Sequence, residues 1–103
     1  MSTSQKTIVY QRKQAMGTLT LHGSVDIFEA TLLYTTVQRA IRDHKATTIC
    51  LDFAEVERLD VSAAQLLLTL RRDVEATGRL FVLGETVSLA TKMLAPMGIS
   101  LQP

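Results

Sequence analysis

The sequence predicts a single α/β domain with a mixed, mostly parallel sheet of four to five strands packed with three main helices. A chain of 103 residues suits one small domain. Its 47% hydrophobic content and net charge of +1 indicate a packed core. The apolar spacing also alternates along the chain between a strand period and a helix period. The expected order is β–β–α–β–α–β–α–β, with crossover connections after an opening hairpin.

The first segments predict a tail followed by a hairpin. Residues 1–6 are polar and read as a flexible tail, so the domain is expected over 7–103. Residues 6–11 and 18–23 are strand-like, and residues 12–17 lie between them as a connection. Apolar and polar residues alternate in the second of these strands, which is typical of a strand with one buried face.

The middle of the chain predicts a helix, a strand and a second helix. From Asp26 the apolar residues recur every three or four positions, which indicates an amphipathic helix ending near 44–45. Residues 47–53 form an almost continuous apolar run, typical of a central strand. A second helix is expected from Ser62 to Ala76, closed by Gly78.

The last segments predict one more repeat of this pattern. Residues 79–84 read as a central strand, and 85–98 as a third helix stopped by Pro96 and Gly98. Residues 99–103 are expected to form a short final strand.

The composition argues against binding to nucleic acid and against insertion into a membrane. The near-neutral charge and the small size of the basic clusters, Arg12–Lys13 and Arg71–Arg72, argue against a nucleic-acid binder. No apolar run approaches the roughly 20 residues of a membrane helix, and no leader peptide is seen. A cytoplasmic protein without membrane insertion is expected.

Catalytic and metal signatures are not found. Cys50 has no ligand-type neighbour at metal spacing and is expected to be an inert core thiol. His22 and His44 are the only candidate bases, and neither has a nucleophile nearby in sequence. The sequence therefore predicts no enzyme activity, no metal and no cofactor.

The expected site lies where strands end and helices begin. Three segments are predicted to converge there: 23–26, 58–62 and 84–86. The simpler interpretation is that their Asp, Ser and Thr residues cap helices. Ser62 with Gln65 has the form of a capping box, which leaves Asp60 without an assigned role.

The second predicted helix carries two apolar stripes. Its expected core stripe is Ala63, Leu66, Leu67, Leu70 and Val74. A second strip is continued by charged residues and is a candidate protein-binding face, with plain packing as the alternative: Val61, Ala64, Leu68, Arg71, Arg72 and Glu75.

The segment TTICLDFAEVERLDVSAAQLLLTLRR resembles the STAS domain of bacterial anti-sigma factor antagonists. LHGSVDIFEA is similar to that family's Gly-x-Leu-Asp turn, and GRLFVLG with MGISL to its closing elements. The resemblance implies that Ser62 is phosphorylated by a partner kinase that is itself the anti-sigma factor, with Asp26 and Asp60 at the acidic positions. Val61 and Ala63 depart from the family's Asp-Ser-Ser-Gly step, which bears on close approach by a kinase.

The resemblance implies a non-enzymatic signalling module that binds a protein partner, with a homodimer as a further possibility. Two alternatives stay open. The continuation QLLLTLRR is also similar to STAS proteins of chemotaxis arrays, and to the accessory STAS subunit of a phospholipid ABC transporter ATPase.

Overall fold

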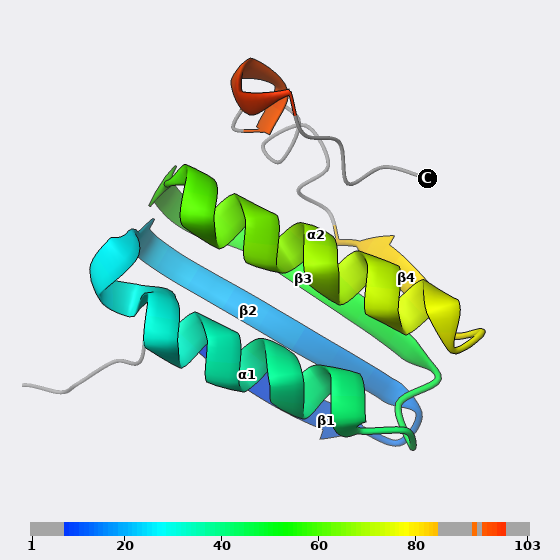
Figure 1. The fold of residues 1–103 in the computed structure, drawn as a ribbon. Coiled ribbons are helices and arrows are strands. Elements are labelled where there is room, and N and C mark those ends of the chain that lie inside the picture. The colour runs from blue at the N-terminus through cyan, green and yellow to red at the C-terminus, as the bar shows by residue number, and fades with distance from the viewer. Residues whose placement is uncertain (1–7, 85–91, 93, 99–103) are drawn as a thin grey trace, which may run out of the picture.

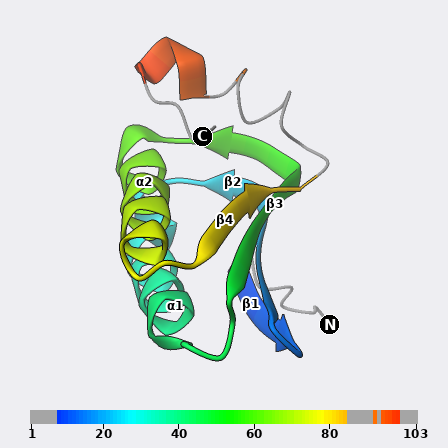
Figure 2. The same cartoon turned by 90° about the vertical axis from the view of Figure 1, so that its right-hand side faces the viewer.

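The computed structural model describes residues 8–84, 92 and 94–98 (Figure 1). The described strands form one sheet in the order β1-β2-β3-β4, and both long helices lie on one face of it (Figure 2). β1 pairs antiparallel with β2, whereas β2–β3 and β3–β4 are parallel. The α/β class and the mixed sheet of the sequence prediction are therefore confirmed.

The opening hairpin is longer than expected. β1 spans Ile8–Lys13 and β2 spans Met16–Val25, so the turn between them consists of residues 14–15 alone. Gln14 adopts a φ of 56°, in the left-handed region that tight turns require. The predicted connection at 12–17 is thus mostly strand.

β3, Thr48–Leu59, runs well past its predicted end at 53. Its pairing with β2 shifts register twice, each time because β3 carries one more residue than β2. These two bulges explain why its buried residues Leu51, Val56 and Leu59 are unevenly spaced. Strict alternation could not identify such a strand from sequence.

A short 3-10 helix, η1 (Ile27–Glu29), precedes α1 (Ala30–Arg42). The predicted start at Asp26 therefore covers both elements. α1 buries Leu33, Thr36, Val37 and Ala40 against the rest of the domain. The helix is confirmed, and it ends slightly before the expected 44–45.

α2 spans Val61–Ala76 and leads into β4, Leu80–Leu83. At its end, Gly78 has a φ of 79°. Its N–H donates to Glu75 O at 3.0 Å, and the Arg79 N–H donates to Val74 O at 3.2 Å. This is the glycine-terminated helix end that the sequence predicted.

Arg79 is buried and ties the end of α1 to the start of β4. Its guanidinium Nη2 donates to Ile41 O at 2.6 Å, and Nη1 donates to Asp43 O at 3.2 Å. Weaker donations reach Ala40 O and Ala46 O. A cation at a helix C-terminus is favourable, so Arg79 satisfies carbonyls that α1 leaves unpaired. We call this arrangement the Arg79 clasp.

The C-terminal predictions are tested only in part. Of the expected third helix at 85–98, most residues lie outside the described part of the chain, which shows helical residues at 92 and 94 and a 3-10 turn, η2 (Ala95–Met97). Two long helices are therefore described where three were expected. The final strand at 99–103 lies outside the described residues.

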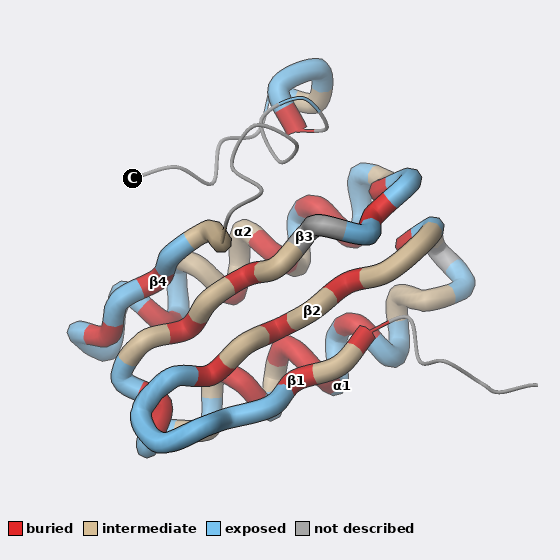
Figure 3. Tube along the Cα trace, turned by 180° about the vertical axis from the view of Figure 1, so that it is seen from behind, coloured by how far each residue is buried: buried red, intermediate tan, exposed pale blue. Residues whose placement is uncertain are grey.

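The core lies between the helices and the sheet, and the opposite sheet face is seen from behind in Figure 3. Leu19 and Leu21 are fully buried toward the helices. Cys50 is half-buried, contrary to the expectation of a core thiol. Burial and the negative charge of Asp52 raise the pKa of its thiol, which keeps it protonated at neutral pH.

Candidate functional site

Two of the three predicted segments meet at one rim of the sheet. Val25 pairs with Leu59 where β2 and β3 end, and the Asp60 N–H donates to Val25 O at 3.1 Å. Asp26 and Asp60 both line a hollow of about 380 Å³ beside Glu57 and Arg58. We call this region, with the first turn of α2, the rim.

Asp60 is the N-cap of α2. Its backbone is extended, with φ −87° and ψ 173°, and its Oδ1 accepts a hydrogen bond from the Ala63 N–H at 2.9 Å. The predicted capping box of Ser62 and Gln65 is therefore wrong. The helix begins one residue earlier than expected, so Ser62 already lies within its first turn.

Asp26 has the equivalent role at η1. Its Oδ1 accepts from the Phe28 N–H at 2.9 Å, and its carbonyl accepts from the Glu29 N–H at 2.9 Å. Both rim aspartates thus satisfy backbone donors at helix starts, and both line the hollow.

Ser62 is exposed at the surface of the rim. Within the described part of the chain its hydroxyl makes no hydrogen bond, because Asp60 has taken the capping role. Its neighbour Val61 is 52% exposed. An accessible hydroxyl therefore stands at the positive end of a helix.

Of the third predicted segment, Gly84 is the described residue, and it lies away from the rim. The Gly84 N–H donates to Leu51 O at 3.0 Å, eight residues before β3 ends at Leu59. The rim prediction is therefore wrong for Gly84, since the bulged extension of β3 carries the rim beyond it. Residues 85 and 86 lie outside the described residues.

The predicted second strip of α2 is not a continuous exposed face. Ala64 is fully buried, and Leu68 is half-buried and packs against the core. Because α2 contacts α1 as well as β3 and β4, its buried arc is wider than the prediction assumed. Leu66, expected in the core, is only half-buried.

The charged end of that strip is at the surface. Arg71 is half-buried and pairs with Glu75, with 3.4 Å between Nε and Oε1. Arg72 is exposed. Of the predicted strip, Val61, Arg72 and Glu75 are the exposed members.

The described residues contain no group of three or more His, Cys, Asp or Glu side chains able to hold a metal ion. His22 is half-buried on β2, and His44 is exposed after α1. No helix in the described part of the chain is long and apolar enough to cross a membrane.

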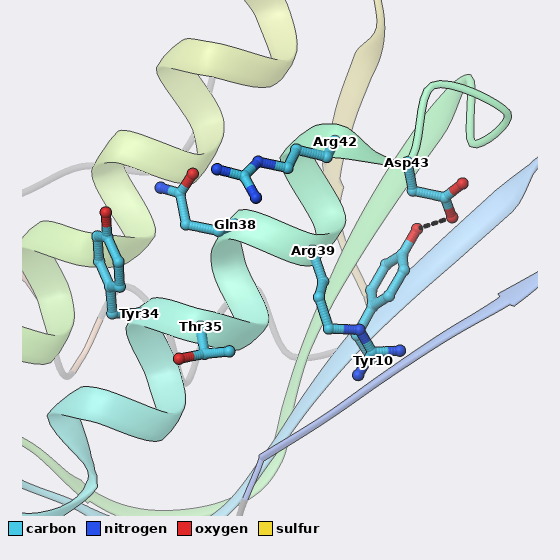
Figure 4. A pocket seen from close by; sticks show the side chains of 7 residues that line it. All are labelled: Tyr10, Tyr34, Thr35, Gln38, Arg39, Arg42 and Asp43. Carbon is cyan, nitrogen blue, oxygen red and sulfur yellow. Dashed lines mark hydrogen bonds between the residues drawn. The ribbon is translucent and has the colours of Figure 1, made fainter.

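A second hollow, which the sequence analysis missed, lies at the other end of α1. It has a volume of about 470 Å³ and combines aromatic, polar and basic side chains (Figure 4). We call it the α1 groove, and it is lined by Tyr10, Tyr34, Thr35, Gln38, Arg39, Arg42 and Asp43. Tyr10 comes from β1, which is why no local motif could reveal the groove.

Asp43 organises one wall of the groove. The Tyr10 hydroxyl donates to Asp43 Oδ2 at 2.8 Å, and Arg12 Nε lies 2.9 Å from the same oxygen. Gly17 gives the Tyr10 ring room, since a Cβ there would overlap the Tyr10 hydroxyl. Burial and the bond to Asp43 raise the pKa of Tyr10, so its hydroxyl stays a donor.

The mixed sheet with both long helices on one face, and a helix that starts at a capped rim, is the arrangement of a STAS-type domain. The family model described as the Mlab STAS domain matches residues 8–100. The chain therefore belongs to the STAS domain family.

Solved structures share the fold. The anti-sigma factor antagonist SpoIIAA in its unphosphorylated form is 20% identical, with a TM-score of 0.67, and the match covers 82% of this chain and 79% of that one. Bacillus SpoIIAA in the phosphorylated form is 20% identical, with a TM-score of 0.66, and the match covers 88% of this chain and 85% of that one. An anti-sigma factor antagonist from Mycobacterium paratuberculosis is 15% identical, with a TM-score of 0.70, and the match covers 89% of this chain and 77% of that one. No match is found among curated proteins.

Proposed function

We propose that this protein is a non-enzymatic signalling module whose rim binds a partner protein, and that phosphorylation of Ser62 by a serine kinase controls this binding. One observation carries the proposal. Ser62 is exposed in the first turn of α2, and its hydroxyl is uncommitted because Asp60 caps the helix.

The helix start can tolerate a phosphate. Phosphorylation adds about −1.5 to −2 charges at neutral pH, and the amides at a helix N-terminus stabilise negative charge. The fold therefore survives the modification. Asp26 and Asp60 line the adjoining hollow, so a phosphate would join them in a concentrated negative patch. A partner fitted to a neutral serine would lose affinity.

The two departures from the family's Asp-Ser-Ser-Gly step are compatible with this role. Ala63, at the glycine position, is only 1% exposed, so its methyl group points into the core and leaves the partner's approach clear. Val61, at the first serine position, is exposed and adds apolar contact area. SpoIIAA, a structural neighbour, has been solved in phosphorylated and unphosphorylated forms, which supports phosphorylation as a control in a protein of this fold.

A second candidate is a permanent accessory subunit on a transporter ATPase. The observation in its favour is the run QLLLTLRR on α2, which is similar to the accessory STAS subunit of a phospholipid transporter. In that case the partner would dock on α2 and Ser62 would need no modification. A STAS protein of a chemotaxis array is the remaining alternative.

The deciding experiment measures affinity for a kinase, anti-sigma factor or ATPase encoded beside this gene. Ser62→Ala should bind like the unmodified protein, and Ser62→Asp should bind at least about tenfold more weakly, because it places a charge in the contact. Incubation with the neighbouring kinase and ATP should add one phosphate at Ser62.

Thr47→Asp is the matched control, since Thr47 is exposed at the opposite end of the sheet. It should bind like the wild type. Equal affinities for all three variants, together with tight binding to a transporter ATPase, would favour the accessory-subunit function instead.

A further inference from the structure

The outer face of α1 has an ordered pattern that the rim does not use. Thr35, Arg39 and Arg42 follow one another at spacings of four and three residues, so they share one face of the helix. Tyr34 and Gln38, four residues apart, form the neighbouring row, and Tyr34 is 54% exposed. The outer surface of α1 thus presents an aromatic ring in its second turn and two arginines toward its end.

The two arginines at the end of α1 line the α1 groove. Gln38 and Arg42 extend from one side of the helix, while Arg39 lies beside Tyr10 (Figure 4). The Arg39 guanidinium carbon is 5.9 Å from the centre of the Tyr10 ring, within range of a cation–π interaction. This contact holds one guanidinium in place before any ligand arrives.

The positive charge of the groove is not neutralised by its own lining. Asp43 is the carboxylate among the lining residues, and both of its oxygens already accept from Arg12 or Tyr10. In the described part of the chain, Arg39 and Arg42 form no ion pair. Two guanidinium groups therefore face solvent with free donors.

The helix terminus does not account for these two arginines either. Basic residues in a last turn commonly serve the unpaired carbonyls there. In this protein the Arg79 clasp already donates to Ala40 O and Ile41 O. Arg39 and Arg42 are left available for a ligand.

We propose that the α1 groove is a second docking surface, which binds an acidic amphipathic helix of a partner protein. Carboxylates one turn apart would pair with Arg39 and Arg42, since a guanidinium binds a carboxylate through two parallel hydrogen bonds. An apolar side chain of the same helix would cover the exposed ring of Tyr34. The small number of cations and the overall charge of +1 disfavour a nucleic acid.

This surface is distinct from the rim. The rim lies at the start of α1 and α2, whereas the groove lies at the end of α1 beside β1 (Figure 1). Along the axis of α1, Arg42 lies about 18 Å from Ala30 at the rim end of the helix. One partner can therefore bind the groove while another binds or leaves the rim.

The test uses a display library of helical peptides, selected on the full chain and counter-selected on an Arg39→Glu, Arg42→Glu variant. The recovered peptides should carry Asp or Glu one turn apart beside Leu or Phe. In fluorescence anisotropy, Arg39→Glu and Arg42→Glu should each weaken a recovered peptide about tenfold. Tyr34→Ser should weaken it several-fold.

Lys92→Glu is the matched control, because Lys92 is exposed and the charge change is the same. It should leave affinity unchanged, and so should Ser62→Asp, which separates this surface from the rim. Recovery of peptides without an acidic pattern, or of none that depend on the arginines, would overturn the proposal. So would tighter, arginine-dependent binding of an oligonucleotide or of anionic phospholipid vesicles. Circular dichroism would verify that each variant is folded.

Discussion

The rim and the α1 groove are built by different means. At the rim, Asp26 and Asp60 bind backbone amides two or three residues away in sequence. In the groove, Tyr10 and Asp43 bind each other across 33 residues. The caps of the rim are therefore local, although the pairing of Val25 with Leu59 is what brings the two helix starts together. The wall of the groove forms only when β1 packs beside the end of α1, because Tyr10 and Arg12 hold Asp43. The comparison teaches that the individual residues of the rim can be recognised from local sequence, whereas those of the groove cannot.

The largest expected effect on stability comes from breaking the long-range contacts of the Arg79 clasp. Arg79→Met keeps the apolar stem of the side chain but removes its donors, so Ile41 O loses its hydrogen bond from Arg79, while Asp43 O keeps only the one from the Ala46 N–H. We expect a loss of about 3 kcal/mol in the free energy of unfolding. Urea denaturation followed by circular dichroism measures it.

Arg72→Met is the control for this variant, because Arg72 is an exposed arginine on α2. Its cost should stay within about 0.5 kcal/mol, as for most surface substitutions. An equal loss in both variants would show that the clasp contributes no special stability.

A smaller effect on stability is expected from removing the local cap of α2 at the rim. Asp60→Ala removes the cap of α2 and should cost about 1 kcal/mol. Ser62→Ala should cost nothing, since Ser62 caps nothing and Ala has the higher helix propensity. Denaturation of both variants and hydrogen exchange at the Ala63 amide provide the measurement. A greater loss of stability in Ser62→Ala than in Asp60→Ala would show that Ser62, and not Asp60, caps α2.

The smallest expected effect is the contribution of Asp43 to stability at acid pH. Partial burial opposes ionisation of Asp43, but the hydrogen bond from Tyr10 and the charge of Arg12 outweigh it and hold the pKa of Asp43 below its ordinary value of 3.8. A carboxyl with a lowered folded-state pKa stabilises the fold above its unfolded pKa. That stability is lost as the pH falls through the folded pKa.

Denaturation at a series of acid pH values tests this expectation. Wild type should lose more stability below about pH 4 than Asp43→Asn, whose side chain cannot titrate. Parallel loss in both proteins would mean that Asp43 contributes nothing to the acid response. The rim aspartates are unchanged by this substitution, so the comparison isolates the groove.

The order of the main elements and the meeting of β2 and β3 at the rim were predictable, because periodicity and helix-start chemistry are local. The length of β3 was not, since its bulges break the alternation around Val56. Asp60 and Ser62 are both good caps by residue type, and only the extended backbone of Asp60 decides between them. Ala64 seemed exposed because the prediction did not include α1 as a neighbour of α2. Arg79 and the α1 groove depend on contacts between distant residues.

The paired bulges of β3 mark where this chain can change length during evolution. β2 keeps a regular alternation past both of them, and Val56 and Leu59 face the core because they pair with Gly23 and Val25. Removing the extra residue of either bulge would therefore leave Leu59 opposite Val25 and Asp60 at the rim. Homologous chains can thus differ here by one or two residues without moving the rim, whereas a deletion in β2 would shift every later pair.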